Sequence, residues 1–572
     1  LENHVEDIIE DLDGRLLLAT RKGCFQLEIR GSDPKDFTMQ PWTYGAALST
    51  NHLRTILPAA NGNLWFGTVQ HGVKYWDRKS GNFITLEHDE KNDRSLSNNN
   101  VRTMLLDEEE NLWVGTFDGL NFLRNGSKDF VHYPRQKGDG SGDLSNNSIR
   151  ALFTDRSNGL WVGTYYGGVN HYDENYNNFT NFQYSPHRNS LSKDVVSSFA
   201  EDKSGNLWIG TEGGGLNYFN QATRKFTHYV PERGNENSLS GLNLKELLLD
   251  GDQLWIGMFR AGLNRMNTVT GTFQRYRHEP DNPNSLSHDN VYGLLRKDRY
   301  LWIATYGGGL NVLDLDEQQF HRYRADSDNP DGLNSDQARV IIMTRRGDYY
   351  IGTEQGLQRI VLNEKGLPTQ FITVLAKEKI YGLQEDSQGN IWVGTFSNGF
   401  FRLNPMSLEL NQYTTEQGLP GNAVFGILET SGGNLWMSTN NGLSKLDQAT
   451  GVFTNYGLSN GLKNLEYHFN AYAKTVSGEL LCGGINGFTR FDPGTISAND
   501  YYPPLVFTKL KRNNELVVPG EHKDLLTNSI NQTEELTFAY NEANFTIGFA
   551  ALDYFSPEYN RYAYQLEGLD RD

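Results

Sequence analysis

The sequence is poor in cysteine and in basic residues, and each shortage excludes a class of protein. Its 2 cysteines, Cys24 and Cys482, cannot build a disulfide framework or a thiolate metal site. Its 52 basic residues face 70 acidic ones, and the net charge of −18 argues against a nucleic-acid partner for this region, because phosphate binding needs a basic surface. No run of about 18 apolar residues occurs, so no segment is expected to span a membrane.

Glycine and aromatic residues are abundant instead. There are 59 glycines in 572 residues and only 17 prolines, and aromatic residues make up 12%. With few helix-favouring runs, this composition indicates many short strands joined by tight turns. The chain starts at Leu1 without a signal peptide and stops at Asp572 in mid-pattern, so we expect it to be a piece of a longer protein.

One tryptophan-containing phrase recurs along most of the chain. The spacing between copies is 47 or 48 residues as far as Trp302 and 42 to 48 residues after it. The copies stand at Trp65, Trp113, Trp161, Trp208, Trp255, Trp302, Tyr350, Trp392 and Trp436. Leu17 and Leu481 stand in degenerate copies, which brings the number of units to eleven. A fixed period of this length is typical of repeat architectures.

Residues 190–229 show what one unit contains. A strand from Val195 to Glu201, a turn at Gly205, and the strands LWIGT, LNYFN and KFTHY give four antiparallel strands. This pattern predicts an all-β fold of β-propeller blades, with Trp and Leu filling the space between neighbouring blades. Because propellers usually close with four to eight blades, eleven units predict two rings, or one complete ring and part of another.

After about residue 500 the phrase ends. The stretches PPLVFTKLKRNNELV and ELTFAYNEANFTIGFAALDY alternate apolar and polar residues, which predicts the start of a β-sandwich. The remaining length is too short for a complete one.

Units such as NLWIGTEGGGLNYFN and LWVGTYYGGVNHYD resemble the regulator-type propeller repeats of hybrid two-component sensor histidine kinases. The stretch holding Tyr559, Tyr562 and Tyr564 resembles the Ig-like three-tyrosine module that follows those propellers. The resemblance implies two seven-bladed propellers, and counting back seven units from Leu481 then divides the chain. We expect four blades of an incomplete first propeller at 1–189, a complete seven-bladed propeller at 190–495, and a truncated Ig-like module at 503–572.

The resemblance also implies a function. Many members of this family are periplasmic sensors that bind oligosaccharides and regulate genes for polysaccharide breakdown. It implies an oligosaccharide or other small ligand, a signal passed through the Ig-like module, a homodimer, and membrane attachment only through a C-terminal segment outside this sequence. The kinase itself is not in the sequence, so this region is not expected to be an enzyme.

Catalytic motifs are missing from the sequence. The 13 histidines are scattered, and none stands in an HExxH, GxSxG or GxxxxGK context. The triple glycines at 213–215 and 307–309 lie between strands, which favours turns over a phosphate loop. Carboxylate pairs such as Glu201–Asp202 and Glu385–Asp386 precede Gly–Asn turns, which favours turn capping and leaves a calcium ligand as the alternative. We expect no catalytic residue, metal or cofactor in this region. The alternatives to a sensor are a propeller-type polysaccharide lyase or glycosidase and a protein-interaction scaffold.

The turn after each W-x-G-T phrase is the most variable part of a unit. Such turns gather at the mouth of a propeller channel, where ligands bind. Aromatic faces stack on sugar C–H patches, and charged side chains bond to hydroxyl groups. Ordinary surface variation is the alternative interpretation. This series supplies the candidate ligand-binding residues Tyr165, Tyr166, Glu212, Phe259, Arg260 and Tyr306.

A second series follows the first apolar residue of each opening strand. It reads Arg54, Arg102, Arg150, Val196, Lys245, Tyr292, Arg339, Tyr381 and Phe425, and five of the nine are basic. If that strand lines the channel, like charges approach one axis and need compensation. Local Asp or Glu partners would provide it, or an acidic ligand such as a uronate- or sulfate-bearing oligosaccharide. This series adds the candidates Lys245, Tyr292, Arg339 and Tyr381.

Overall fold

A computed structural model describes residues 4–29, 37–48, 51–133, 144–156, 158–172, 179–496, 503–521, 525–539, 544–553, 560 and 562–568. The chain forms two compact units, Leu1–Glu174 and Asn175–Asp572, here called unit 1 and unit 2. Their regular structure is antiparallel β-sheet with short 3-10 helices, namely η1 (Gly45–Leu48), η3 (Leu458–Asn460) and η4 (Ile530–Gln532). The predicted all-β fold is confirmed.

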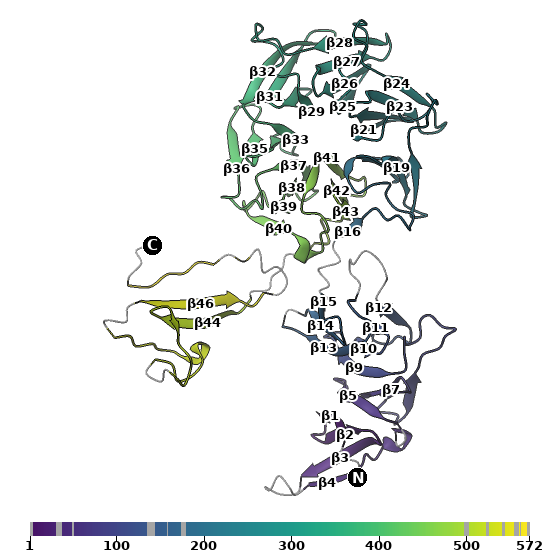
Figure 1. Ribbon diagram of the computed structural model, residues 1–572, viewed down its shortest axis with the longest axis vertical. Coiled ribbons are helices and arrows are strands. Elements are labelled where there is room, and N and C mark those ends of the chain that lie inside the picture. Colours follow the sequence, from purple (N-terminus) through teal and green to yellow (C-terminus); the bar gives the residue numbers. More distant parts are fainter. Residues whose placement is uncertain are drawn as a thin grey trace. The chain divides into compact units, whose positions relative to one another are not determined.

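The described residues of unit 1 form four sheets of consecutive strands, and the innermost strands β1, β5, β9 and β13 lie next to one another in that order (Figure 1). The four sheets comprise β1 (Val5–Glu10), β2 (Leu16–Thr20), β3 (Gly23–Ile29) and β4 (Phe37–Pro41); β5 (Leu53–Pro58), β6 (Leu64–Thr68), β7 (Val73–Trp76) and β8 (Phe83–Leu86); β9 (Val101–Leu106), β10 (Leu112–Thr116), β11 (Gly119–Leu123) and β12 (Phe130–Tyr133); and β13 (Ile149–Thr154), β14 (Leu160–Thr164) and β15 (Val169–Tyr172).

Unit 2 contains seven four-stranded sheets in the described residues. Six are consecutive: β17 (Val196–Glu201), β18 (Leu207–Thr211), β19 (Gly215–Asn220) and β20 (Lys225–Tyr229); β21 (Leu244–Asp250), β22 (Gln253–Met258), β23 (Leu263–Asn267) and β24 (Phe273–Tyr276); β25 (Val291–Lys297), β26 (Tyr300–Thr305), β27 (Gly309–Asp314) and β28 (Gln319–Tyr323); β29 (Ala338–Met343), β30 (Tyr349–Thr353), β31 (Gly356–Leu362) and β32 (Pro368–Ala376); β33 (Ile380–Glu385), β34 (Ile391–Thr395), β35 (Phe400–Leu403) and β36 (Leu410–Tyr413); and β37 (Val424–Glu429), β38 (Leu435–Thr439), β39 (Gly442–Leu446) and β40 (Phe453–Tyr456).

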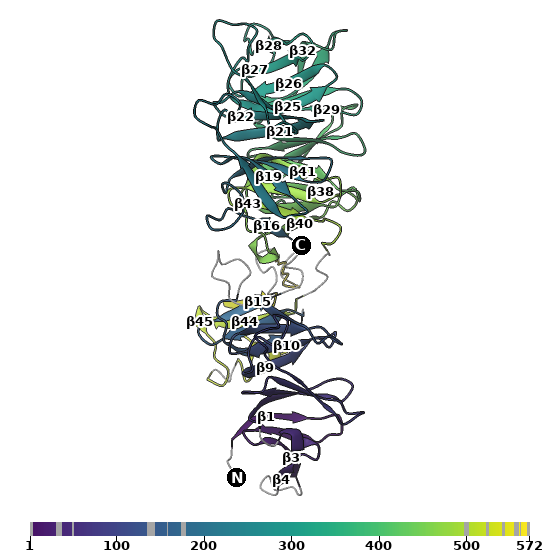
Figure 2. The ribbon, with the colours of Figure 1, turned by 90° about the vertical axis from the view of Figure 1, so that its right-hand side faces the viewer.

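The seventh sheet closes these blades into a ring. It joins β41 (Tyr467–Lys474), β42 (Leu480–Gly484) and β43 (Gly487–Phe491) to β16 (Thr180–Phe182), which precedes the other strands of unit 2 by sequence. Each innermost strand contacts that of the next blade, and β41 contacts β17, so the ring is complete (Figure 1; seen from the side in Figure 2).

The pairing of β16 moves one expected boundary. By the repeat pattern, this strand follows the blade of β13 to β15 and would be its fourth strand. It pairs instead with β43, from Thr180 opposite Arg490 to Phe182 opposite Phe488. The ring therefore begins upstream of residue 190, and the two compact units divide after Glu174.

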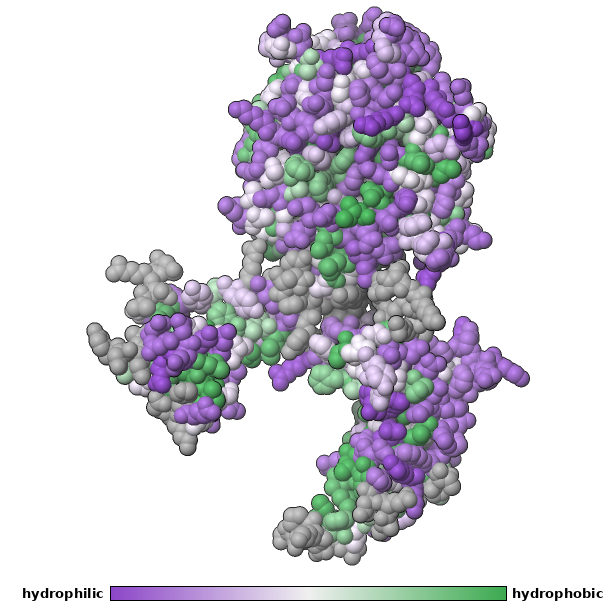
Figure 3. All heavy atoms as spheres, viewed as in Figure 1, coloured by the Kyte–Doolittle hydropathy of each residue, from purple (hydrophilic) through white to green (hydrophobic). Residues whose placement is uncertain are grey.

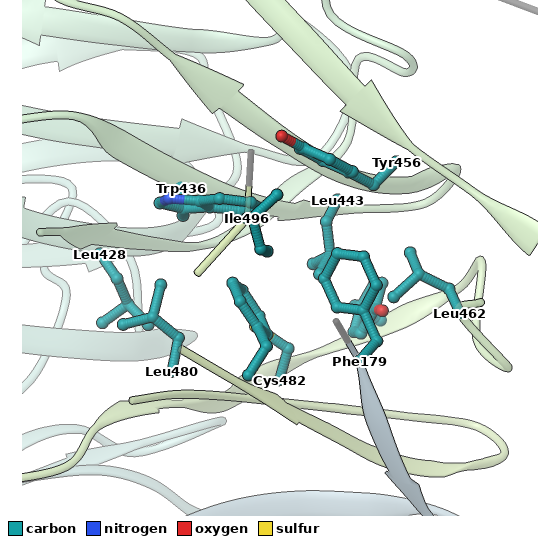
Figure 4. Packing of buried hydrophobic residues seen from close by; sticks show 11 residues of the cluster. Phe179, Leu428, Trp436, Leu443, Tyr456, Leu462, Leu480, Cys482 and Ile496 are labelled. Atoms are coloured by element: carbon teal, nitrogen blue, oxygen red, sulfur yellow. The ribbon is translucent and has the colours of Figure 1, made fainter. Parts of the chain in front are cut away.

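Apolar residues between neighbouring blades form the core. The cluster in Figure 4 joins Trp436 and Leu443 of one blade to Leu480 and Cys482 of the next, and Phe179 packs there just before β16. The repeated tryptophans of the ring are 1–4% exposed, and Trp302 stacks on Tyr349 of the following blade at 4.7 Å. The predicted packing role of the tryptophans is confirmed. The face of the ring that Figure 3 shows is mostly hydrophilic, with scattered apolar patches.

The C-terminal segment forms a small sheet of its own. Its strand order is β45 (Glu515–Leu516), β44 (Leu505–Arg512) and β46 (Phe545–Ala551), and Leu510 packs against Val517, Leu525 and Leu526. Tyr562 accepts a hydrogen bond from the amide of Ala551 at 3.1 Å, Tyr564 is exposed, and Tyr559 lies outside the described residues. The Ig-like assignment of this segment stays a prediction.

Candidate functional site

Each innermost strand except β41 carries one extra residue near its start. In the blade of β21, Leu244 pairs with Met258 and Glu246 with Gly257, which leaves Lys245 in a β-bulge. A bulge bends the strand and re-aims its side chain. The same irregularity selects Glu6, Arg54, Arg102, Arg150, Ser197, Tyr292, Arg339, Tyr381 and Phe425. Eight of the nine positions aligned by sequence occupy the bulge. Val196 is wrong by one residue, because it pairs with Thr211 and Ser197 takes the bulge.

In most blades the threonine that ends the preceding strand holds the variable turn, whereas β22 ends in Met258 and β42 in Gly484. Thr211 Oγ1 donates to the carbonyl of Gly215 at 2.8 Å, and Thr305 Oγ1 to that of Gly309 at 2.9 Å. Gly215 has a φ of +80°, and a Cβ there would lie 2.5 Å from the Tyr229 carbonyl oxygen, so the turn requires glycine. The triple glycines are therefore turn residues, as predicted.

The turn residues and the bulge residues meet at one mouth of the ring. Lys245 lies over the ring of Phe259 in its own blade and forms an ion pair with Glu212 of the preceding blade. Arg339 likewise contacts the turns of its own blade and of the preceding blade. It lies 2.6 Å from Glu354 in its own blade and 4.7 Å from the ring centroid of Tyr306 in the preceding one. The two series predicted separately from sequence thus form one site, here called the ring mouth.

Arg339 lies at the centre of an aromatic cage. Its guanidinium carbon is 4.3 Å from the ring centroid of Tyr381, 5.5 Å from Tyr292 and 5.2 Å from Phe469. Glu354 accepts from its Nε at 2.7 Å, and both side chains of this pair are about nine-tenths buried (10% and 11% exposed). The cation is therefore neutralised and stacked within the protein itself.

Phe469 enters this cage through an enlarged bulge that the sequence analysis missed. On β41, Tyr467 pairs with Gly484 and Tyr472 with Cys482, so several residues of β41 bulge where other blades have one. The Phe469 ring stacks on Tyr292 at 5.5 Å and lies 5.2 Å from Lys245 Nζ. Asn470, with a left-handed φ of 61°, donates to the carbonyl of Tyr292. In the sequence, only the irregular spacing of EYHFNAY relative to the other units could have indicated this enlarged bulge.

Glu212 gathers the other charges of the ring mouth. His468 Nε2 lies 2.9 Å from its Oε1, and Lys245 bonds to the same oxygen. Burial opposes ionisation of Glu212, but the His468 hydrogen bond and the charges of His468 and Lys245 outweigh it and lower its pKa to about 2. Both basic bulge residues of the ring therefore have carboxylate partners, as the local-pairing interpretation predicted.

The structure brings seven of the ten candidate residues together: Glu212, Lys245, Phe259, Tyr292, Tyr306, Arg339 and Tyr381. Tyr292, Tyr381, Lys245 and Arg339 are buried, whereas the rim also holds exposed groups. Arg260 is exposed and lies over its neighbour Phe259 at 5.1 Å. Phe396, 46% exposed, stacks on Tyr381 at 5.4 Å. Tyr165 and Tyr166 occupy the equivalent turn in unit 1, with exposures of 47% and 84%.

The carboxylate pairs cap turns. Asp202 Oδ1 accepts the amides of Ser204 and Asn206 at 2.8 and 2.9 Å, while Glu201 Oε2 accepts the amide of Val476 in the adjacent blade. Asp386 repeats the pattern. The turn-capping prediction is confirmed. Among the described residues, no group of three His, Cys, Asp or Glu side chains is placed to hold a metal ion.

Five segments of the chain match the sequence model of the two component regulator propeller, at residues 95–118, 143–166, 190–213, 374–397 and 418–441. Each of these segments runs through an innermost strand with its bulge and ends in a variable turn. The chain therefore carries two component regulator propeller repeats.

The relatives of the chain include a kinase and two solved structures. Histidine kinase P4 from Formosa agariphila is 28% identical over 241 residues, which is 41% of this chain and 18% of that protein's length. The extracellular domain of the hybrid two component system BT3049 from B. thetaiotaomicron is 24% identical, with a TM-score of 0.68 over 97% of this chain and 70% of that one. The corresponding domain of BT4673 is 20% identical, with a TM-score of 0.46 over 96% and 72%. The likeness to BT3049 establishes a shared fold. No helix in the described part of the chain is both long and apolar enough to cross a membrane.

Proposed function

We propose that this chain is the ligand-sensing region of a two-component sensor histidine kinase, that it lies in the periplasm, and that it binds an oligosaccharide or a similar small ligand without transforming it. The observation that carries the proposal is the set of two component regulator propeller repeats in both units. The match to a histidine kinase over 241 residues supports the same assignment.

The geometry favours binding on the rim of the ring mouth. The cage below the rim is filled by Phe469, and its charges are already paired. The rim offers the faces of Phe259 and Phe396, with Arg260 and Lys379 beside them. This combination suits sugar rings, which present apolar C–H faces and hydroxyl groups together.

Signalling requires a ligand that favours one arrangement of the receptor by differential affinity. A closed ring is suited to this task, because each of its blades packs against a neighbour on both sides. We propose that two copies pair and that the bound ligand biases their arrangement.

Calorimetric titration of the purified chain with a panel of oligosaccharides tests the proposal. Binding is expected for at least one glycan, and Phe259→Ala with Phe396→Ala should weaken it at least tenfold. Val269→Ala with Val452→Ala is the matched control, since both valines are exposed (76% and 58%) on outer turns of the ring. Absence of binding to every glycan, or release of shorter products from a polysaccharide, would contradict the proposal.

A further inference from the structure

Two arginines of unit 1 lack the partner that the equivalent residues possess. In the ring, Lys245 is paired with Glu212 and Arg339 with Glu354. In unit 1 the bulge residue Arg54 lies 3.6 Å from Glu6, the bulge residue of the preceding blade. Arg102 and Arg150 occupy the same bulge position in the next two blades, and no carboxylate of the described residues lies within ion-pair distance of either.

Aromatic rings surround these two guanidinium groups instead. Arg102 lies 5.1 Å from the ring centroid of Phe117 and 5.7 Å from that of Tyr165, and Arg150 lies 5.1 Å from the same Tyr165 ring. One tyrosine is therefore shared by two cations. The nearby carboxylate of Asp118 accepts a hydrogen bond from Asn147 at 2.8 Å.

The arginine pair has unused binding capacity. Nη1 of Arg102 is buried and has no hydrogen-bond partner. Burial is the largest cause that lowers the pKa of Arg102, and the neighbouring charges of Arg150 and Arg54 lower it further, against an opposite effect of Tyr165. A guanidinium presents its N–H groups as a planar fork that fits a carboxylate or sulfate group. An anion held between the two arginines would supply both the missing charge and the missing acceptor.

The surrounding rings indicate what carries the anion. Phe117 is 53% exposed and Tyr165 47%, and Tyr166 packs edge-to-face on Tyr165 at 4.3 Å. Two neighbouring guanidinium groups beside exposed aromatic faces suit a sugar ring with an acidic substituent. A free inorganic ion suits them less well, because it would leave the aromatic rings uncovered.

We propose that Arg102, Arg150, Phe117 and Tyr165 form a binding site for an acidic sugar, in which the guanidinium groups hold its carboxylate or sulfate and the aromatic rings contact its apolar face. The inference rests on the proposed sensing function and deepens it by naming the ligand class and a site in unit 1.

Calorimetric titration of the whole chain with three probes tests the site: a uronate-containing disaccharide, a sulfated disaccharide, and a neutral disaccharide of the same linkage. At least one acidic probe should bind, and Arg102→Gln with Arg150→Gln should weaken it at least tenfold. Because the double variant removes repulsion between two cations, its thermal unfolding midpoint should not fall. Arg94→Gln with Arg296→Gln gives the same change in net charge away from the site and should leave the affinity unchanged within twofold.

Each outcome has a distinct meaning. Binding of an acidic probe that the double variant does not weaken overturns the site, and binding of the neutral probe alone overturns the ligand class while sparing the sensing function. Absence of binding to any saccharide overturns both proposals. Binding of an acidic peptide in place of the saccharides would show that the arginine pair recognises protein, which also overturns the inference. Tyr165→Ala should weaken the acidic saccharide more than inorganic sulfate, since only the sugar contacts the ring.

Discussion

At the residue scale, the identity of the partner decides what a basic side chain at the bulge position can do. Lys245 forms an ion pair with Glu212 and Arg339 with Glu354, so both positive charges are neutralised within the protein. Arg102 and Arg150 stand at the same position of the repeat without a carboxylate beside them. The same bulge position thus holds paired cations at Lys245, Arg339 and Arg54, and cations without a carboxylate partner at Arg102 and Arg150.

The ionisation of Glu212 makes the stability of the ring pH-dependent. Its folded pKa of about 2 lies below the ordinary value of 4.5, so its stabilising effect is complete above about pH 4.5 and is lost as the pH falls toward 2. Glu212→Gln should lower the free energy of unfolding by about 1–3 kcal/mol at pH 7. Urea unfolding of both proteins between pH 7 and pH 3 should show this difference shrinking below about pH 4.5. A difference that stays constant over the range would show that Glu212 is not held ionised by its partners.

At the scale of elements, the ring depends on a strand that its own repeat pattern assigns elsewhere. The three residues of β16 complete the sheet of β41 to β43. Phe182 of β16 stacks on Phe488 at 4.5 Å with parallel planes, and it meets Phe219 of the next blade edge-on at 5.4 Å. One aromatic side chain therefore joins the two ends of the ring.

Replacement of Phe182 measures how much the pairing of β16 stabilises the closed ring. Phe182→Ala should lower the free energy of unfolding of the ring by about 2–4 kcal/mol, because it removes a packed aromatic ring and leaves a cavity. The matched control is Phe153→Ala, since Phe153 is 62% exposed on a strand of unit 1. Equal unfolding midpoints for the two variants in a denaturant titration would show that β16 does not hold the ring closed.

The repeat made most of the fold predictable. The Trp phrase and the glycine turns located the four strands of β17 to β20 almost to the residue, since local turn chemistry and alternation decide such hairpins. The exchange of β16 and the entry of Phe469 into the cage were not predictable, because each depends on a partner distant in sequence. The sequence predicted that basic residues such as Lys245 and Arg339 have Asp or Glu partners nearby. It did not identify these partners as Glu212 and Glu354, because that requires knowing that the turn residues and the bulge residues lie at the same mouth of the ring.

At the scale of the whole molecule, the chain divides into bodies with separate cores. In the described residues, the cluster around Trp42 and Phe66 is built from the first two blades of unit 1. The ring is closed by its own strands, including β16, which lies after the division at Glu174.

We therefore expect the two units to unfold separately. Calorimetric scanning of the whole chain should give at least two transitions, and Phe182→Ala should lower only the one that belongs to the ring. A fragment of residues 175–496 should reproduce that transition within a few degrees. A single transition that moves as a whole with Phe182→Ala would show that the units unfold as one.

The late pairing of β16 also has a consequence for biosynthesis. Thr180 leaves the ribosome well before Arg490, its partner across the sheet, has been translated. Chains elongate at roughly 5–20 residues per second, so the edge of this strand waits many seconds for its neighbour. During that interval the ring cannot close, and the edge of β16 stays unpaired, which is a state prone to aggregation until the last blade is made.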